Sequence, residues 1–383
     1  MSAPSPTLHW EENDEAKSSL WRSEAAVAPA KRVVLADDQT KADEAWRLAC
    51  EGTALLWCGD FQNARQLLQA MARRIDKKPA KKKRAASMTE AFHQHRMAQA
   101  QRARTLGMLL VPLNADYTVP LRRAPEVAEA CSEAYGPATV DTQASVVSLR
   151  ELQGLIGAHE WRKKGVPIPA LGANIHPHYG VFSPVRGEYI DLVATAPLPA
   201  ATQANSLAFD IGTGTGVLAA LLAKRGITRV VATDQDSRAL ACASDNIARL
   251  GLERQVEIVQ ADLFPEGRAP LIVCNPPWVP AKPSSPIENA VYDPDSRMLK
   301  GFLAGLKDHL APSGEGWLIL SDLAEHLGLR SRADLLKLIE SAGLKIIQRH
   351  DIRPRHPKAA DIDDPLHLAR VAEKTSLWRL AAA

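Results

Sequence analysis

The sequence predicts an α/β protein whose second half is built on a parallel sheet. Four short apolar runs, each ending in polar residues, alternate with stretches of helical character. The runs are residues 207–211, 229–234, 256–262 and 271–275. Parallel strands bring their carboxyl ends to one edge of a sheet, and open α/β folds bind ligands there. We therefore expect the polar residues at these ends to lie together.

A glycine-rich turn follows the first run. Glycines at 212, 214 and 216 lead into an apolar segment at 217–223, which predicts a strand, a tight turn and a helix. Glycine lets a ligand approach the backbone where a Cβ would intrude, and a helix N-terminus presents unpaired N–H groups. The turn therefore predicts a nucleotide-type site, and the alternative is a tight turn without a ligand. Asp234, about 20 residues further on, has the position at which dinucleotide-type folds bind ribose.

Length and composition indicate a globular protein of two domains. The chain has 383 residues, of which 46% are hydrophobic and 24% charged, so each domain has enough apolar material for a core. The net charge of +3 points to no particular partner. The charge is unevenly distributed, because residues 65–104 carry 12 Lys or Arg against Asp76 and Glu90.

The cysteines and histidines predict neither disulfides nor a metal site. The five cysteines are widely spaced without a Cys-x-x-Cys pair, which fits a reducing compartment. The pairs His93/His95 and His176/His178 have no cysteine or carboxylate cluster at ligand spacing, so we expect no metal. Residues 1–7 lack the features of a signal peptide, and no apolar run is long enough to span a membrane. We therefore expect a cytoplasmic protein without membrane contact.

The first 165 residues are expected to form a lead-in and a separate α/β domain. Residues 1–30 show no sustained period and are predicted to be flexible. Residues 31–165 begin with a strand, helix, strand, helix pattern that has no glycine-rich loop after its first strand. The strands are predicted at 33–36 and 54–57, and the helices at 41–51 and 61–75. A later helix is predicted at 146–161. A linker at 163–169 leads into the second domain, which comprises residues 166–383.

A basic loop interrupts this first domain. Residues 77–84 contain six Lys or Arg and a proline, which argues against a packed element. Ser87 and Glu90 have the spacing of a capping box and predict a helix that runs toward Leu106. The loop and the helix are either a surface that contacts RNA phosphates or an ordinary solvated segment.

Beyond residue 275 the chain continues to alternate helices and strands. A Pro-rich loop is followed by a helix, a fifth strand, a second helix that Gly343 ends, and a final pair of strands. The first helix is predicted at 295–310, the fifth strand at 314–320 and the second helix at 332–342. The final two strands are predicted at 344–348 and 374–380.

Four motifs at the strand ends together resemble one enzyme family. They are Asp-x-Gly-x-Gly-x-Gly at 210–216, Thr-Asp at 233–234, Ala-Asp-Leu-Phe at 261–264 and Asn-Pro-Pro-Trp at 275–278. The series resembles the class I S-adenosylmethionine-dependent methyltransferases of the HemK-like, small-domain group. The resemblance implies a Rossmann-like, mostly parallel sheet with an antiparallel last strand, S-adenosyl-L-methionine as cofactor, and methyl transfer to a planar nitrogen. It also implies that the N-terminal α/β domain binds no cofactor and serves substrate recognition, as in related ribosomal-RNA methyltransferases.

The same resemblance assigns roles to residues of this chain. Asp234 would bind the ribose hydroxyls, Asp262 the adenine amino group, and the Leu263 N–H the adenine ring. The other cofactor contacts would come from the turn and from the fourth strand end: Asp210, Gly212, Thr213, Gly214, Gly216 and Asn275. In related enzymes the segment before the turn covers the cofactor and forms a wall of the substrate pocket. Phe182, Ser183, Pro184, Arg186 and Glu188 match that position, although the segment has fewer acidic residues than the family pattern. The resemblance implies that Phe182, Pro184 and Arg186 bind the substrate.

We expect the chemistry at the Asn-Pro-Pro-Trp motif. The lone pair of an amide or aromatic amine is delocalised, so hydrogen bonds that hold its N–H groups favour the transition state. The Asn275 side-chain oxygen and the Pro276 carbonyl would accept these bonds, and Pro277 supplies no competing N–H. Trp278 would stack on the acceptor. No general base is required, so we expect no catalytic histidine; the alternative is a Pro-rich turn with a buried tryptophan.

The sequence leaves the acceptor open. The leading hypothesis is the side-chain amide of a protein glutamine, in a translation factor or ribosomal protein. The alternative is the exocyclic amine of an rRNA or tRNA base, which the N-terminal α/β domain and the basic loop favour. A third hypothesis, a cofactor-binding protein without activity, is opposed by the joint presence of the site residues.

Overall fold

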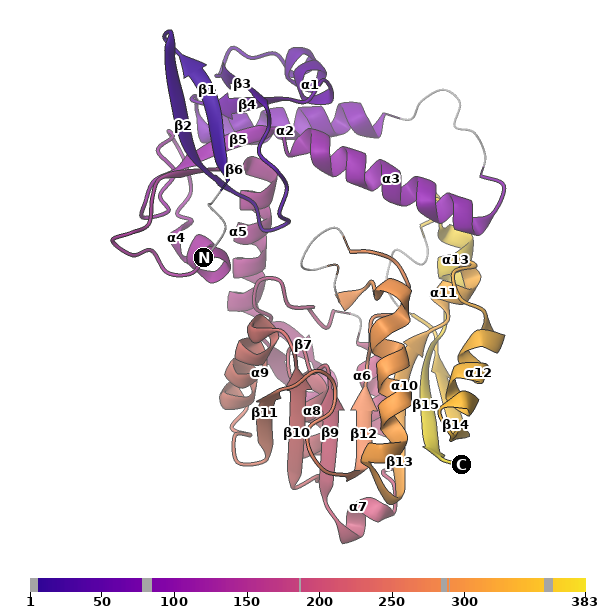
Figure 1. Cartoon of the computed structure of the whole chain (residues 1–383). Coiled ribbons are helices and arrows are strands. Elements are labelled where there is room, and N and C mark those ends of the chain that lie inside the picture. The colour runs from indigo at the N-terminus through magenta and orange to yellow at the C-terminus, as the bar shows by residue number, and fades with distance from the viewer. Residues whose placement is uncertain (1–5, 78–84, 186, 284–287, 289, 355–360) are drawn as a thin grey trace. The chain divides into compact units, whose positions relative to one another are not determined.

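The computed structural model describes residues 6–77, 85–185, 187–283, 288, 290–354 and 361–383. They form two compact units: residues 1–84 with 93–160, and residues 85–92 with 161–383 (Figure 1). The division at residue 160 lies close to the domain boundary expected at 165. Residues 85–92, which include the first turn of helix α3 (Met88–Leu106), group with the second unit, which the sequence did not predict.

The first unit contains a six-stranded mixed sheet with the order β1-β2-β6-β5-β4-β3. The strands β3, β4 and β5 are parallel, as are β2 and β6, whereas β1 with β2 and β5 with β6 are antiparallel. The elements are β1 (Thr7–Glu12), β2 (Glu15–Arg22), β3 (Arg32–Ala36), α1 (Ala42–Cys50), β4 (Thr53–Trp57), α2 (Phe61–Asp76), α3, β5 (Leu109–Leu113), α4 (Ala128–Tyr135), β6 (Ser145–Ser148) and α5 (Leu149–Lys164).

The prediction of a flexible lead-in at residues 1–30 is wrong for the described part of that segment. The strands β1 and β2 form a hairpin whose two turn residues, Asn13 and Asp14, have left-handed backbone angles (φ 53° and 61°). Asn and Asp tolerate this conformation better than most residues and are typical of two-residue hairpin turns. Leu8 and Trp21 bury their side chains, and β2 pairs with β6, so the hairpin belongs to the sheet.

Two further predictions in this region are wrong. Residues 145–148, of which 146–148 were predicted within a helix, form β6, and α5 begins only at Leu149. A short apolar run fits a strand or a buried helix equally well, so pairing with β2 and β5 decides its structure. The linker predicted at 163–169 contains the end of α5 and strand β7 (Val166–Ile168), which pairs with β8 (Ala173–Ile175).

The second unit contains a seven-stranded sheet with the order β11-β10-β9-β12-β13-β15-β14. The strands from β11 to β13 are parallel, and β15 runs antiparallel to both β13 and β14. The predicted Rossmann-like, mostly parallel sheet with an antiparallel last strand is therefore confirmed. The elements after β8 are α6 (Glu188–Thr195), α7 (Ala201–Ala204), β9 (Leu207–Ile211), α8 (Val217–Lys224), β10 (Arg229–Asp234), α9 (Ser237–Arg249), β11 (Val256–Gln260), β12 (Ala269–Cys274), α10 (Arg297–His309), β13 (Leu310–Ser321), α11 (Leu323–His326), α12 (Arg332–Ser341), β14 (Leu344–Ile352), α13 (His367–Ala372) and β15 (Thr375–Ala382).

Different helices cover the two faces of this sheet. The core on one face joins α6, α8 and α9 to the strands, and the core on the other face joins α10 and α12 to them. Successive residues of a strand point to opposite faces, so Ala208 packs toward α8 and Phe209 toward α10. By the same alternation Asp210 lies on the α8 face. Figure 1 shows α10 crossing in front of the sheet and α6 behind it.

Most of the predicted basic loop, residues 78–84, lies outside the described residues. Helix α3 begins close to the predicted position, and the Glu90 N–H donates to Ser87 Oγ (3.1 Å). The Glu90 carboxylate accepts the Ala86 N–H (2.7 Å), so the interaction resembles the expected capping box. Among the described helices, none is both long and apolar enough to cross a membrane.

Candidate functional site

The glycine-rich turn, Asp234 and Asn275 lie at one edge of the sheet because β10, β9 and β12 are neighbouring parallel strands. The strand β9 leads into the glycine-rich turn, β10 ends at Asp234, and β12 ends one residue before Asn275. The chain runs from β9 outward to β11 and then returns to the other side of β9, so the strand order reverses between β9 and β12. Open α/β sheets bind ligands at such a point.

Two glycines of the turn have left-handed backbone angles but different surroundings. A Cβ on Gly212 (φ +72°) would overlap the terminal methyl group of Met298. A Cβ on Gly214 (φ +55°) would meet no described atom within 4 Å. The Gly212 and Thr213 N–H groups both donate to the Thr233 carbonyl (2.9 and 2.8 Å), which fixes the turn on β10. A ligand can therefore approach the backbone of the turn at Gly214. Gly216 ends the turn and is the residue before α8.

Asp210 is buried beneath the turn and binds the chain itself. Its Oδ2 accepts hydrogen bonds from Thr213 Oγ1 (2.6 Å) and from the Ala219 N–H (3.1 Å) at the start of α8. These bonds hold the strand, the turn and the helix together. Burial raises the pKa of Asp210 to about 6, although both hydrogen bonds act in the opposite direction.

We expect Asp210→Asn to remove a pH dependence of stability. The folded-state pKa of Asp210, about 6, lies above the ordinary value of 3.8, so folding favours the protonated carboxyl. The natural chain should therefore gain up to about 3 kcal/mol as pH falls through 6 toward 3.8, and about 1 kcal/mol of this between pH 7 and 5. Asparagine keeps an acceptor oxygen but has no proton to gain. Denaturant unfolding of both chains at pH 7 and 5 measures the difference, and an equal pH dependence would contradict the assigned cause.

Asp234 lies next to the turn with unused acceptor capacity. Its Oδ2 accepts the Gly214 N–H (3.1 Å) and its Oδ1 accepts the Asp236 N–H (3.0 Å). Burial raises its pKa. A carboxylate offers about four lone-pair sites, so two further hydrogen bonds remain possible. That capacity matches the two hydroxyls of a ribose.

Asp262 and Leu263 follow β11, on the other side of β10 from β9. The Asp262 carboxylate is exposed and pairs with Arg297 (3.0 Å), an interaction worth about 1 kcal/mol or less at an exposed position. Leu263 has a left-handed backbone (φ +77°), which is uncommon for a bulky residue, and its carbonyl accepts from Thr233 Oγ1 (2.5 Å). Such backbone strain is concentrated at binding sites.

The Asn-Pro-Pro-Trp motif forms a turn with an internal hydrogen bond that the sequence did not predict. Trp278 Nε1 donates to Asn275 Oδ1 (2.9 Å). The indole is half-buried and packs against the cores on both faces of the sheet, Pro276 is buried, and Pro277 is half-buried. An amide oxygen has two lone pairs, so this bond fixes the orientation of the Asn275 amide and leaves one acceptor position.

The segment before α6 holds the remaining predicted residues. Phe182 is half-buried and Pro184 is buried, whereas Arg186 lies outside the described residues. Two polar atoms here, Ser183 Oγ and Glu188 Oε1, are buried without a hydrogen-bond partner in the described part of the chain.

Two residues near the start of α10, Asp293 and Met298, lie at the site, and no sequence motif predicted them. The Asp293 carboxylate accepts the N–H groups of Met298 (3.0 and 3.1 Å) and Leu299 (3.2 Å), and the Asp293 N–H donates to the Val279 carbonyl (2.9 Å). Asp293 therefore links α10 to the residue after the Asn-Pro-Pro-Trp motif and holds Met298 over Gly212. The available signal was an acidic residue shortly before an apolar helix.

Asn246 is a third residue at the site that no sequence motif predicted. It is fully buried on α9, and its Nδ2 donates to the carbonyls of Thr215 (3.1 Å), Cys242 (3.0 Å) and His176 (3.2 Å). Its Oδ1 accepts the His176 N–H (2.7 Å), so one amide fixes the glycine-rich turn to the segment that leads to α6. The available signal was a polar residue within an apolar stripe of the helix.

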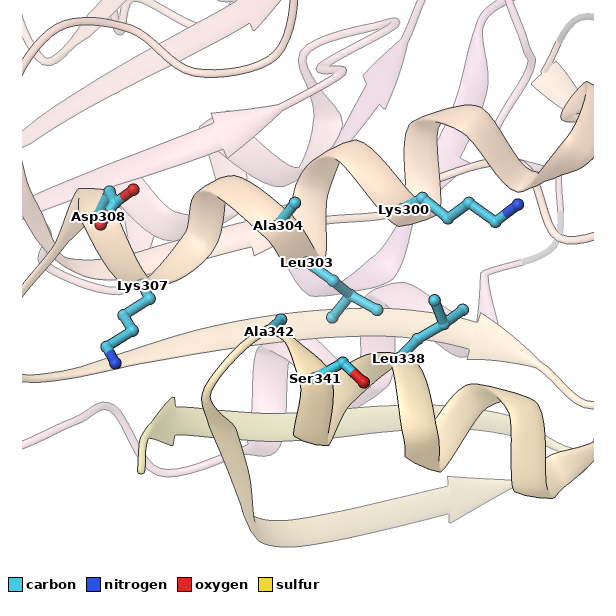
Figure 2. A pocket seen from close by; sticks show the side chains of 8 residues that line it. All are labelled: Lys300, Leu303, Ala304, Lys307, Asp308, Leu338, Ser341 and Ala342. Carbon is cyan, nitrogen blue, oxygen red and sulfur yellow. The ribbon is translucent and has the colours of Figure 1, made fainter.

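A groove between α10 and α12 contains none of the predicted site residues. It has a volume of about 510 Å³ and is lined by Lys300, Leu303, Ala304, Lys307, Asp308, Leu338, Ser341 and Ala342. Figure 2 shows Leu303 and Leu338 facing each other across it. In the described part of the chain, no three or more His, Cys, Asp or Glu residues are grouped to hold a metal ion.

The chain matches a family model and several known proteins. The model described as methyltransferase small domain matches residues 172–331, which include the glycine-rich turn, Asp234 and Asn275. A release factor glutamine methyltransferase from Cereibacter sphaeroides is 40% identical over 111 residues, which is 28% of this chain and 36% of that protein. A ribosomal protein L11 methyltransferase from Pelotomaculum thermopropionicum is 46% identical over 69 residues, 18% of this chain and 22% of that protein.

A third relative is matched over more of its length. A tRNA1(Val) (adenine(37)-N6)-methyltransferase from Shewanella loihica is 30% identical over 187 residues, which is 46% of this chain and 72% of that protein. The chain thus spans about a third or less of the length of the first two relatives and more than two thirds of the third.

Proposed function

We propose that this chain, which belongs to the methyltransferase small-domain family of class I S-adenosylmethionine-dependent methyltransferases, transfers a methyl group from S-adenosyl-L-methionine to a planar nitrogen. The observation that carries the proposal is the convergence of the glycine-rich turn, Asp234 and Asn275 at three neighbouring strand ends. The turn and Asp234 suit a nucleoside, and the Asn275 amide beside them suits an acceptor that carries N–H groups.

The residues present fit this cofactor. Gly214 leaves its backbone accessible, and Asp234 has two acceptor positions for the ribose hydroxyls. We propose that the Leu263 N–H contacts the adenine ring, as its strained backbone suggests. When bound, the cofactor supplies an electrophilic methyl group on a cationic sulfur.

The contribution of the chain is to hold the target nitrogen. Asn275 Oδ1 keeps one acceptor position beyond its bond to Trp278, and the Pro276 carbonyl is the second proposed acceptor. Hydrogen bonds at these oxygens favour the geometry in which the nitrogen lone pair is released from conjugation. Positioning and polarisation therefore supply most of the rate enhancement, and no general base takes part in the attack.

We expect Trp278→Phe to reduce turnover about three- to tenfold while the affinity for the cofactor stays within twofold. Phenylalanine keeps an aromatic face but loses the N–H that orients the Asn275 amide, and one such neutral hydrogen bond is worth about 0.5–1.5 kcal/mol. Single-turnover rates and calorimetry separate the two effects. Full turnover in Trp278→Phe would show that the indole N–H is not required, and Trp278→Ala, which also removes packing, is the comparison variant.

The first candidate acceptor is the side-chain amide of a protein glutamine, in a translation factor or ribosomal protein. The support is the 40% identity to a protein named as a release factor glutamine methyltransferase. A primary amide carries two N–H groups, which matches the two acceptor oxygens of Asn275 and Pro276.

The second candidate is the exocyclic amine of an RNA base. Of the relatives described, the tRNA adenine methyltransferase is the one whose length the chain covers most fully. The 12 Lys or Arg between residues 65 and 104 support the same candidate, because cationic side chains supply most of the non-specific affinity for nucleic acids.

Two experiments test the proposal and divide the candidates. Calorimetry with S-adenosyl-L-methionine comes first, and no binding would reject the proposed function. The cofactor with a labelled methyl group is then incubated with the chain and cell extract, followed by protease or nuclease. Label that protease releases supports the protein amide, and label that only nuclease releases supports RNA. Binding without incorporation into either fraction would favour a cofactor-binding protein without activity.

A further inference from the structure

A short segment from the first half of the chain belongs to the second unit. Residues 85–92 group with that unit, although the match to the family model begins only at residue 172. The Thr89 hydroxyl donates to the Leu327 carbonyl (2.8 Å) at the end of α11. A Cβ on Gly328, which has a left-handed backbone (φ +69°), would lie only 2.6 Å from Thr89 Oγ1. The segment and the end of α11 are therefore in close contact.

Phe92, the last residue of this segment, is buried in an apolar cluster beside the Asn-Pro-Pro-Trp motif. Its side chain is only 3% exposed. The cluster also contains Val279, Leu327, Leu366 and Ala369. Val279 is the residue after the motif, and the Trp278 indole packs against the same cluster. Aromatic side chains bury large apolar areas, so one wall of the motif is built partly by Phe92.

Val279 is held by its backbone as well as by this packing. Its N–H donates to the Val291 carbonyl (3.2 Å), and its own carbonyl accepts the N–H groups of Ala281 and Asp293 (both 2.9 Å). These bonds connect the end of the motif to the residues before α10, whereas the side-chain packing connects it to the start of α3 and to α13. The position of the motif therefore depends on both sets of contacts.

Trp278 connects this packing to the group that is proposed to react with the acceptor. The indole packs against the cluster, and its Nε1 donates to Asn275 Oδ1 (2.9 Å). Asn275 is the proposed acceptor of a hydrogen bond from the target nitrogen, so a shift of the indole would turn the amide out of place. Misplacement by about 1 Å at a distance from the chemistry can cost about 10²-fold in rate.

We propose that Phe92 is a positioning residue for methyl transfer, which holds Trp278 and Val279 where they orient the Asn275 amide. The inference rests on the proposed function, because Phe92 acts through the same motif. Phe92 itself binds neither the cofactor nor the acceptor. The first half of the chain then contributes to the chemistry, in addition to any part it has in recognising the acceptor.

The first test is the turnover of Phe92→Ala in the full chain, measured with labelled S-adenosyl-L-methionine and cell extract. We expect the initial rate at saturating cofactor to fall at least about tenfold, while the affinity for the cofactor, measured by calorimetry, stays within about twofold. A rate equal to that of the natural chain would overturn the proposal.

Ile227→Ala is the matched control for a cavity in the same unit. Ile227 is as deeply buried (1% exposed), but it precedes β10 and so lies at the opposite edge of the sheet from the strand ends. The rate and the affinity should both stay unchanged in this variant. If Ile227→Ala loses as much turnover as Phe92→Ala, the loss reflects general destabilisation and the proposal is wrong.

A double-mutant comparison tests the path through Trp278. In the Trp278→Phe background the indole N–H no longer orients Asn275, so Phe92→Ala has less to disturb. We expect the loss of turnover caused by Phe92→Ala to be at least about threefold smaller in that background than in the natural chain. Losses of the same size in both backgrounds would mean that Phe92 does not act through the indole, which overturns the assignment.

Hydrogen exchange without any ligand tests the positioning independently of activity. In Phe92→Ala the Val279 and Ala281 amides should exchange at least about tenfold faster, because their hydrogen bonds hold the segment that loses its packing. Residues 207–216, which contain β9 and the glycine-rich turn, should exchange as in the natural chain. Unchanged exchange at Val279 and Ala281 would overturn the proposal.

Two further outcomes keep the test decisive. If Phe92→Ala does not fold, Phe92→Leu, which leaves a smaller cavity, replaces it and is judged by the same exchange and turnover criteria. A natural chain that transfers no methyl label would remove the proposed function and the catalytic role of Phe92 together. An active natural chain whose Phe92 variants keep natural turnover and exchange would remove this inference alone.

Discussion

Asn275→Ala should lower turnover by about 10²- to 10³-fold while the affinity for S-adenosyl-L-methionine changes less than threefold. The expected loss is that of one transition-state hydrogen-bond acceptor. The Asn275 oxygen is oriented by Trp278 Nε1 at 2.9 Å, so the amide is held in place before the acceptor arrives. Methyl incorporation from the labelled cofactor measures turnover, and calorimetry measures affinity.

The same variant leaves the Trp278 indole N–H without its acceptor, so its stability must be measured as well. An unsatisfied, half-buried donor costs about 1–3 kcal/mol of unfolding free energy. Trp278→Phe is the matched control, because it removes the same hydrogen bond and keeps the Asn275 oxygen. If Asn275→Ala and Trp278→Phe lose turnover equally, Asn275 acts only through its bond to the indole. If Asn275→Ala retains full turnover, the motif is not the catalytic site.

Asp234→Asn should weaken the binding of the cofactor by about 10- to 150-fold. The rate of methyl transfer at saturating cofactor should change only by a small factor relative to the natural chain. The ribose hydroxyls would lose a charged acceptor, a contribution of about 1.5–3 kcal/mol. Burial raises the pKa of Asp234, so the affinity of the natural chain should also fall as pH decreases through that raised pKa, because binding requires the ionised form. The variant should lack this decrease.

Asp236→Asn is the control for this experiment. Asp236 caps α9 by accepting the Arg238 N–H (2.8 Å), and asparagine is an equally good cap. It removes the same charge two residues away without touching the proposed ribose site. Because Asp234 also holds the Gly214 N–H, the unfolding midpoints of both variants should be compared. Equal losses of affinity in the two variants would mean that general charge, rather than a ribose contact, is responsible.

The sequence alone determined the sheet of the second unit and named most of the residues that we propose for the site. The strands that end at Ile211, Asp234 and Cys274 are apolar runs between turn signals that alternate with helical stretches, and this alternation is typical of buried parallel strands. The glycine-rich turn and the Asn-Pro-Pro-Trp motif are contiguous in the chain, so their residues could be named before their surroundings were known.

The pairings made over long sequence distances were decided only by the tertiary structure. The hairpin at residues 7–22 and the strand at 145–148 have weak local signals and exist because the sheet of the first unit pairs them. In the site, Met298 lies over Gly212, and Asn246 binds Thr215, from helices far along the chain. No local pattern could predict these contacts, because the free energy that selects them comes from burial and hydrogen-bond satisfaction, which depend on neighbours that only the folded chain brings together.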